Sequence, residues 1–392
     1  MGACIGVAVA ATPKEQKAIV QNGNGGPEVL KLQTIPVLEP GDGQVLVKVY
    51  AAAVNPVDWK MRAGMTGRGG PPGGGAGGAP GGGGAGGPPG GGAPGGAGGG
   101  AGGPPGGGAP GGGGAGGPPG GGGGGGSSTS VPGMDVAGVV EKVGPGVTTF
   151  KVGDPVFSMI GRGKVTGLNG GYSEYVVAPV ANVVAKPKNL TYAQAAGIGT
   201  AGMTGERAVD QAGVAKGQKV LILGIAGGVG SSAAQIAKAR GATVVGTASA
   251  QHNAYLKSIG VDQVIDYTKG NFEDQVKDVD VVINTVTGTD AERSLKTLKK
   301  GGKLVSVAGG VAADKCTAAG VNCIGGGPGG AAGPSEGDML AAVAKLASEG
   351  KFTVKVDKTF ALDKAGDAQV LGAQNHTEGK IILTVAPEAS KK

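Results

Sequence analysis

The sequence predicts an α/β protein in which an all-β region precedes a doubly wound parallel sheet. Three observations carry this prediction. Short runs of alternating apolar and polar residues dominate the first half of the chain, whereas strand-like and helix-like segments alternate after residue 191. Residues 69–126 consist of Gly, Pro and Ala alone. Outside this insertion, the 392-residue chain has the proportions of apolar and charged residues that are typical of globular proteins, and it has enough residues for two domains.

The first domain is expected to span residues 17–191, after a flexible N-terminus at residues 1–16. Its predicted strands lie at 29–35, 45–54, 131–143, 154–159, 172–177 and 183–186. The insertion at 69–126 therefore interrupts one compact region. It has almost no side chains to bury, so we expect a disordered Gly/Pro/Ala loop, either a tolerated expansion or a tether for a partner.

The second domain is expected at residues 192–335. Its predicted strands at 219–223, 243–247, 264–266, 279–284 and 303–307 alternate with helices at 228–240, 252–259 and 290–298. This succession predicts a parallel, doubly wound sheet. The tail at 336–387 departs from the alternation, with helices at 338–349 and 364–373 and strands at 352–360 and 380–385. We expect it to return to the first domain.

The charge pattern argues against binding to nucleic acid. The formal net charge is +7, but the basic residues are dispersed and do not interleave with aromatic residues. The one local cluster comprises Lys296, Lys299, Lys300 and Lys303. We expect it at the end of the predicted helix 290–298, where cations complement the helix dipole.

The cysteine content favours a reducing compartment such as the cytoplasm. Cys4, Cys316 and Cys323 are too few and too scattered for a disulfide framework. No apolar run reaches the roughly 20 residues needed to span a bilayer. Met1-Gly2-Ala3-Cys4 partly matches an acylation signal, although Gly6 stands where Ser or Thr is required. Peripheral membrane association and a chloroplast location therefore stay open.

A glycine-rich turn follows the predicted strand 219–223. Its sequence, Ile225-Ala226-Gly227-Gly228-Val229-Gly230, leads into a helix. Backbone N–H groups and the positive end of the helix dipole would face a pyrophosphate, and the last glycine would allow the helix to pack closely on the strand. Because Ile225 stands where the dinucleotide-binding pattern begins with Gly, a purely structural turn is the alternative.

The end of the second strand of this domain indicates NADP rather than NAD. An NAD site would carry a carboxylate about 20 residues beyond the glycine turn, yet residues 246–252 contain no acid. Ser249 and His252 could instead accept a ribose 2′-phosphate, although the segment holds no Arg or Lys. The alternative role for Ser249 is that of a helix N-cap.

Several segments together resemble a known superfamily. They are Asn55-Pro56-Val57-Asp58-Trp59-Lys60, Pro132-Gly133-Met134-Asp135-Val136-Ala137-Gly138, the turn at 226–230, Val264-Ile265-Asp266-Tyr267 and Gly379-Lys380. They resemble the zinc-free medium-chain dehydrogenase/reductase superfamily, and within it the quinone oxidoreductases and the alkenal/enone reductases. The resemblance covers residues 17–385 apart from the insertion and residues 316–334. It implies a GroES-like β domain, a Rossmann domain and NADPH bound between them.

The resemblance also implies that no metal takes part. Relatives that use zinc carry Cys at the position of Asn55 and His at the position of Met134. Neither replacement is a good zinc ligand, and the chain has no four-cysteine lobe.

The resemblance further implies roles for individual residues. Lys60 would reach the nicotinamide ribose or the adjoining phosphate, and Thr204 would line the nicotinamide. The other coenzyme contacts would come from Gly227, Gly228, Val229 and Gly230 at the pyrophosphate, Ser249, His252 and Tyr267 at the 2′-phosphate, Val307, Ala308 and Gly309 at the carboxamide, and Gly379. The alternatives are a solvated Lys60, a strand-end Tyr267, and Asp58 and Asp135 as residues of the fold.

These inferences predict an oxidoreductase. We expect NADPH to deliver hydride to the β-carbon of an enal or enone, or to a quinone, with Asn55 or Lys60 near the polarised oxygen. The proton would come from solvent or from a ribose hydroxyl of the coenzyme. The alternative is an NADPH-binding structural or membrane-associated protein with little turnover. The resemblance allows a homodimer, but residues 325–330 depart from the family pattern at the expected dimer edge.

Overall fold

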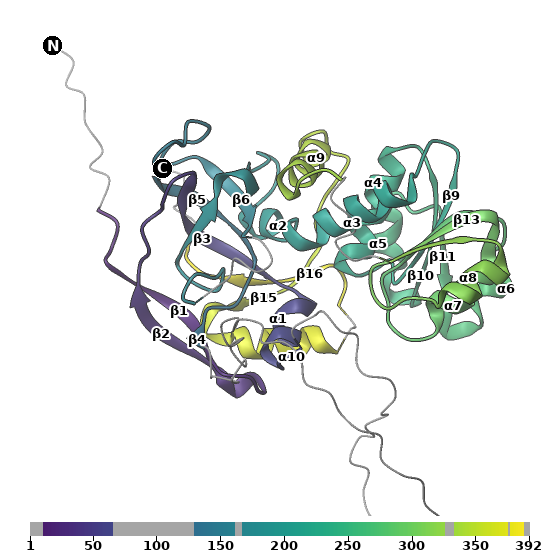
Figure 1. Ribbon diagram of the computed structural model, residues 1–392, viewed down its shortest axis with the longest axis horizontal. Coiled ribbons are helices and arrows are strands. Elements are labelled where there is room, and N and C mark those ends of the chain that lie inside the picture. Colours follow the sequence, from purple (N-terminus) through teal and green to yellow (C-terminus); the bar gives the residue numbers. More distant parts are fainter. Residues whose placement is uncertain (1–10, 66–128, 161–166, 326–332, 375–376, 388–392) are drawn as a thin grey trace, which may run out of the picture. The chain divides into compact units, whose positions relative to one another are not determined.

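The computed structural model describes residues 11–65, 129–160, 167–325, 333–374 and 377–387 (Figure 1). The Gly/Pro/Ala insertion at 69–126 and the acylation signal at the N-terminus lie outside the described residues.

The β domain is built around a seven-stranded sheet of described residues, in the order β15-β16-β3-β5-β6-β8, with β7 paired to β3. The strands are β3 (Gln44–Val54), β5 (Asp135–Val143), β6 (Pro155–Met159), β7 (Tyr175–Pro179), β8 (Val183–Ala185), β15 (Val356–Ala361) and β16 (Lys380–Thr384). β3 pairs with β5 along most of its length, with β7 over its first half and with β16 over its second half. It is therefore buried almost throughout, which explains its long apolar run.

A smaller sheet has the order β2-β1-β4, with β1 (Glu15–Asn22), β2 (Leu30–Pro36) and β4 (Thr129–Ser130). β1 begins inside the segment expected to be flexible, so that expectation is wrong for its last two residues. Gln16 is buried and accepts a hydrogen bond from the Tyr175 N–H at 2.7 Å. The strand was missed because its apolar core is only Ala18-Ile19-Val20.

The second domain contains a six-stranded sheet of described residues, in the order β11-β10-β9-β12-β13-β14 (Figure 1). Its strands are β9 (Lys219–Leu223), β10 (Thr243–Ala248), β11 (Gln263–Asp266), β12 (Val279–Asn284), β13 (Leu298–Ser306) and β14 (Asn322–Gly325). All neighbours are parallel. In chain order this is the 3-2-1-4-5-6 arrangement of a Rossmann fold, which confirms the predicted fold class.

Helices connect and cover these sheets. They are α1 (Pro56–Arg62), α2 (Tyr192–Ala196), α3 (Gly199–Ala212), α4 (Gly228–Ala239), α5 (Asn253–Ser258), α6 (Phe272–Gln275), α7 (Asp290–Arg293), α8 (Ala313–Ala319), α9 (Glu336–Ser348) and α10 (Ala365–Ala373), with 3₁₀ turns η1 (Pro27–Val29), η2 (Val180–Asn182), η3 (Ala250–His252), η4 (Tyr267–Lys269), η5 (Ser294–Thr297) and η6 (Leu362–Lys364). None of the helices in the described ranges is long and apolar enough to cross a membrane.

Helix α3 was not predicted, because its Gly and Thr residues have low helix propensity. The same small residues let it lie close to α4. A Cβ on Gly205 would come within 2.9 Å of the Ala233 nitrogen. One apolar cluster then runs from Ala53 and Phe157 of the β domain to Val220 and Ile222 of β9. Both domains thus share a continuous core.

The expected position of the lysine cluster is wrong. The segment after α7 forms the 3₁₀ turn η5, and β13 already begins at Leu298. Lys299, Lys300 and Lys303 therefore lie on a strand and are not stabilised by a helix dipole.

Two of the three cysteines are paired, although the cysteines are too few for a disulfide framework. Cys316 of α8 and Cys323 of β14 form a disulfide. The left-handed Gly320 ends α8 and turns the chain back into β14, which brings the two residues together. The argument from cysteine content for a reducing compartment therefore no longer holds.

Candidate functional site

The glycine turn lies between the carboxyl end of β9 and the first turn of α4. A Cβ on Gly230 would stand 2.4 Å from the Gly224 carbonyl oxygen and 2.8 Å from the Ile225 Cα, so a side chain here would collide with backbone. Gly227 is the N-cap of α4 and Gly228 its first residue. The N–H groups of this first helical turn are the ones that an α-helix leaves without partners inside the helix. The turn is therefore shaped to let an anionic group approach the backbone.

Ile225, the departure from the dinucleotide-binding pattern, is compensated by another glycine. Ile225 is fully buried, and a Cβ on Gly246 of β10 would lie 2.3 Å from its Cδ1. Gly246 thus makes room for the Ile225 side chain, and the turn keeps its close packing without a first glycine.

Thr204 Oγ1 on α3 and Ser306 Oγ at the end of β13 are buried and have no hydrogen-bond partner among the described residues. The same holds for Gln211 Oε1, Tyr255 Oη and Gln369 Nε2. Leaving a buried polar group unpaired costs about 1–3 kcal/mol, so such groups point to a missing ligand. Together with the glycine turn, the Thr204 and Ser306 hydroxyls fit a dinucleotide. Ser306 was missed in the sequence, where its position next to Val307 was the available signal.

Asn284 organises the loop that follows β13. Its Nδ2 donates to the carbonyl oxygens of Ala308 at 2.7 Å and Val286 at 3.0 Å, and its Oδ1 accepts from the Val286 N–H. Its own carbonyl accepts from the Val307 N–H at 2.8 Å. Val307, Ala308 and Gly309 are therefore held at the carboxyl ends of β12 and β13. The sequence signal for Asn284 was a polar residue ending a buried strand.

Three predicted 2′-phosphate residues lie after the ends of β10 and β11. Ser249 is the residue before η3, and its side chain makes no capping hydrogen bond. Tyr267 is 52% exposed. His252 is buried, and its Nδ1 lies 2.8 Å from Glu378 Oε2. Ser249 and Tyr267 are thus available to a ligand, whereas His252 is already engaged.

Gly379 connects the tail to the glycine turn. Its N–H donates to the Ala226 carbonyl at 2.9 Å, and it forms a parallel bridge with Gly227. The next residue, Lys380, is buried and passes beside Gly228, where a Cβ would come within 2.7 Å of its Cδ. The structure therefore brings Gly379 next to Gly227 and Gly228.

A buried polar network lies behind this turn. Lys380 Nζ donates to Asn55 Oδ1 and to the Val54 carbonyl, and Asn55 Nδ2 donates to Asp135 Oδ2 at 2.9 Å. Asp135 also accepts from the Thr200 N–H and hydroxyl, both at 2.8 Å. Asp135 thereby ties β5 to the first turn of α3, where a carboxylate suits the helix dipole.

Burial controls the titration of these groups. Burial raises the pKa of Asp135 and lowers the pKa of Lys380, and the attraction between the two opposes both shifts. Asp58, which accepts from the Asn55 N–H and the Tyr172 hydroxyl at 2.8 Å each, has its pKa raised by burial to about 7. Asp58 and Asp135 thus have the structural role that the sequence offered as an alternative.

The two residues predicted to lie near the substrate oxygen are not brought together. Asn55 is 1% exposed and its carboxamide is engaged on both sides. Lys60 is exposed on α1. Asn55 could reach a substrate only by giving up one of its bonds to Ala53, Asp135 or Lys380, so this geometry favours a positioning role.

Known proteins resemble this chain over most of its length. The "NADPH-dependent alkenal/one oxidoreductase, chloroplastic" of Arabidopsis thaliana is 32% identical over 385 residues, which cover 96% of this chain and 82% of the relative. The chain belongs to the medium-chain dehydrogenase/reductase superfamily. The quinone oxidoreductase of Sus scrofa is 32% identical over 72% of this chain and 70% of its own.

The domain families of this medium-chain dehydrogenase/reductase agree with the fold. Residues 120–188 match the alcohol dehydrogenase GroES-like domain, and residues 259–383 match the family described as zinc-binding dehydrogenase. The solved quinone oxidoreductase of Coxiella burnetii is 29% identical, with a TM-score of 0.71 over 95% of this chain and all of that one. The first match confirms the predicted GroES-like domain.

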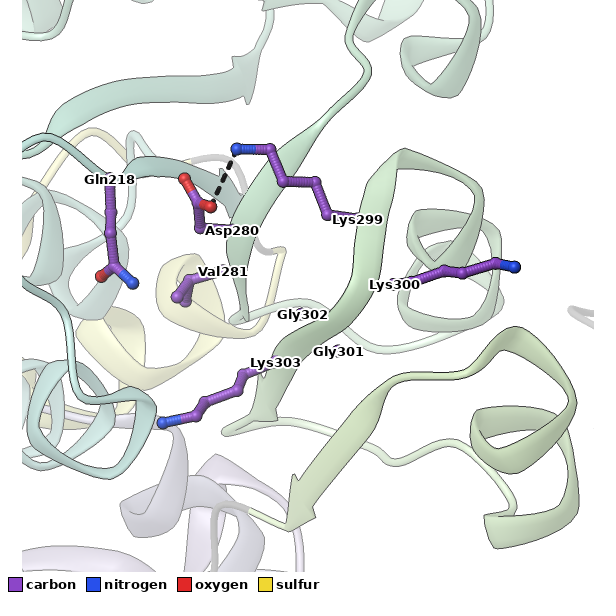
Figure 2. Close-up of a pocket in the computed structure, with 8 residues that line it drawn as sticks. All are labelled: Gln218, Asp280, Val281, Lys299, Lys300, Gly301, Gly302 and Lys303. Atoms are coloured by element: carbon purple, nitrogen blue, oxygen red, sulfur yellow. Dashed lines mark hydrogen bonds and ion pairs between the residues drawn. The ribbon is translucent and has the colours of Figure 1, made fainter.

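A separate hollow of about 150 Å³ lies at the opposite end of the Rossmann sheet, where β9, β12 and β13 begin (Figure 2). It is lined by Gln218, Asp280, Val281, Lys299, Lys300, Gly301, Gly302 and Lys303. Lys299 Nζ is paired with Asp280 Oδ1 at 2.9 Å, and Lys303 Nζ donates to the Ala212 carbonyl at 3.0 Å. Ligands of doubly wound sheets bind at the carboxyl ends of the strands, so we do not assign the coenzyme to this hollow.

Proposed function

We propose that this medium-chain dehydrogenase/reductase binds NADPH at the carboxyl end of the Rossmann sheet and reduces the double bond of an α,β-unsaturated carbonyl, or a quinone. The observation that carries the proposal is the glycine turn, with Gly230 packed against the Gly224 carbonyl, facing a part of the fold with unpartnered Thr204 and Ser306 hydroxyls. The names of the relatives supply the substrate class.

Each predicted contact has a proposed task. The N–H groups of Gly228, Val229 and Gly230, with Gly227, would bind the pyrophosphate, and Ser249 with Tyr267 would bind the 2′-phosphate. Thr204, the loop Val307-Ala308-Gly309 and Gly379 would border the nicotinamide. When bound, the coenzyme supplies the hydride. The residues of the chain orient it and exclude water from the reacting carbon.

Asn55 is proposed to act as a positioning residue. Its carboxamide links the Lys380 ammonium to the Asp135 carboxylate, so it holds together the buried polar network behind the glycine turn. Lys60 is the exposed cation proposed to reach the nicotinamide ribose or phosphate. The proton is proposed to come from solvent or from a ribose hydroxyl, because Asp58 and Tyr172 are buried and bonded to each other.

The reaction is proposed to proceed without a metal. Asn55 and the buried Met134 stand where zinc-dependent relatives have ligands, and the Lys380 ammonium donates to the Asn55 carboxamide. A divalent cation beside that ammonium would be repelled. Elemental analysis of the purified protein tests this, with stoichiometric zinc as the contradicting result.

The proposed activity is tested by following NADPH absorbance with a panel of short enals, enones and quinones. Saturated aldehydes and ketones of matched size are the controls. We expect turnover with the activated acceptors and none with the saturated ones. Lys60→Ala should raise the KM for NADPH several-fold. NADPH binding without turnover on any acceptor would favour the structural alternative, and an unchanged KM would reject the role of Lys60.

A further inference from the structure

Glu378 brings an acidic group to the corner where the ribose of the coenzyme is proposed to bind. The sequence argument for NADP was that residues 246–252 lack an acid. The fold supplies one from the tail, because Glu378 Oε2 lies 2.8 Å from the Nδ1 of His252, a residue 126 positions away. His252 ends η3, directly after β10. This is the place where a carboxylate in a Rossmann fold binds the ribose 2′-hydroxyl.

Glu378 is held in this position by its neighbours. The next residue, Gly379, is bonded to the Ala226 carbonyl and has a left-handed backbone, with φ of +85°. A Cβ on Gly379 would stand 2.2 Å from the Lys355 carbonyl, so the segment cannot shift easily. The second carboxylate oxygen, Oε1, lies 3.4 Å from Lys355 Nζ. The Glu378 side chain nevertheless remains 19% exposed, so a ligand can approach it.

The other charged groups at this corner are differently placed. Asp266, at the end of β11, accepts from the N–H and hydroxyl of Thr268 and lies 3.8 Å from Lys269 Nζ. The Asp266 carboxylate thus interacts with Thr268 and Lys269 of the turn that follows it. His252 Nε2 lies 3.2 Å from Gln251 Nε2. Glu378 is therefore the acid that reaches this corner from outside the strand ends.

We propose that Glu378 determines coenzyme specificity by moderating the preference for NADPH over NADH. This inference rests on the proposed function. A carboxylate can accept a hydrogen bond from a ribose hydroxyl but has no proton to donate to a phosphate oxygen. It also repels the charge of a 2′-phosphate, whereas an unphosphorylated ribose carries no such charge. Glu378 therefore favours NADH relative to NADPH, and His252 and Lys355 act in the opposite direction.

The test is direct binding of NADPH and NADH to the full chain, measured by calorimetry, for wild type, Glu378→Gln and His252→Gln. In Glu378→Gln we expect the ratio of the NADH Kd to the NADPH Kd to rise about tenfold, as for removal of one like charge several ångströms away. In His252→Gln, where Glu378 loses its partner, the ratio should fall. The melting temperature of each variant verifies folding. If Glu378→Gln fails to fold, Glu378→Ala removes the same charge without leaving a buried amide, and the same rise in the ratio is expected.

Glu39→Gln is the matched control, because it removes the same charge from a side chain that is 72% exposed and paired with Lys142 in the β domain. Its coenzyme ratio should equal that of wild type. If the contact between Glu378 and His252 is purely structural, both variants should lose affinity for NADPH and NADH equally, and that result would overturn the proposal. If wild type bound neither coenzyme, the proposed function itself would fail.

Discussion

The two ends of the Rossmann sheet differ in how the backbone is shaped around their polar groups. At the amino ends of the strands a hollow of about 150 Å³ is lined by lysines, of which Lys299 is paired with Asp280 and Lys303 with the Ala212 carbonyl. At the carboxyl ends, the hydroxyls of Thr204 and Ser306 are buried without a partner among the described residues, and they accompany a turn in which Gly230 leaves no room for a side chain. Gln211 Oε1, next to Ala212, is likewise unpartnered among the described residues, so the difference teaches that unsatisfied polar groups mark a binding site only together with such a turn.

The largest effect is expected at the glycine turn. Gly230→Val places a side chain against the Gly224 carbonyl, 2.4 Å from where its Cβ would lie. The turn must open, so we expect the Kd for NADPH to rise by roughly 100-fold or more, about 3 kcal/mol or more. Calorimetry measures the change. Gly325→Ala, on strand β14, is the control and should bind normally, because no atom of the described residues lies within 4 Å of the new Cβ. Equal affinity in the two variants would contradict a binding role for the turn.

An intermediate effect is expected from the buried, fully bonded network. The pKa of Asp58 rises from 3.8 to about 7 on folding, mainly because of burial. The folded chain therefore holds this proton more tightly than the unfolded chain. The resulting stabilisation is complete below pH 4 and is lost as the pH rises through 7. Urea midpoints at several pH values should fall over this range.

Asp58→Asn should flatten that fall in the urea midpoint, because its amide does not titrate. Asp42→Asn, on the exposed surface, is the control and should keep the pH profile of wild type. A profile for Asp58→Asn as steep as that of wild type would show that other groups carry the pH dependence.

The smallest effect is expected at the amino ends of the strands. Lys299→Ala removes an ion pair whose side chains are 48% and 25% exposed. Such pairs contribute about 1 kcal/mol or less to stability. The Kd for NADPH should stay within about twofold of wild type, as calorimetry can verify. A marked loss of coenzyme affinity in this variant would instead place the coenzyme at the amino ends of the strands.

Local patterns were sufficient to predict five strands of the Rossmann sheet, but not its edge strand β14 or the helix α3. The alternation of strands and helices after residue 191 identified the Rossmann fold, because each element carries its own periodicity. Helix α3 was missed because its glycines lower its helix propensity, while they allow close packing against α4. The role of Gly246 could not be predicted either, because it leaves room for the Ile225 side chain, which lies on another segment of the chain.

Particular side-chain contacts between distant residues could not be predicted. Lys380 donates to Asn55 across 325 positions, and Glu378 pairs with His252 across 126. Neither pair has a local signature, so Asn55 was expected beside the substrate and the corner near His252 was expected to lack acid. The disulfide was missed for a related reason. Counting cysteines does not show that Gly320 folds Cys316 back onto Cys323.

The place of β16 has a consequence for biosynthesis. This strand, made of residues 380–384, lies between β15 and β3, whereas β3 is made of residues 44–54. The strands of the Rossmann sheet all fall within residues 219–325 and leave the ribosome earlier than β16. We therefore expect the domain that is translated first to be completed last, because the second half of β3 lacks its partner strand until β16 has been synthesised.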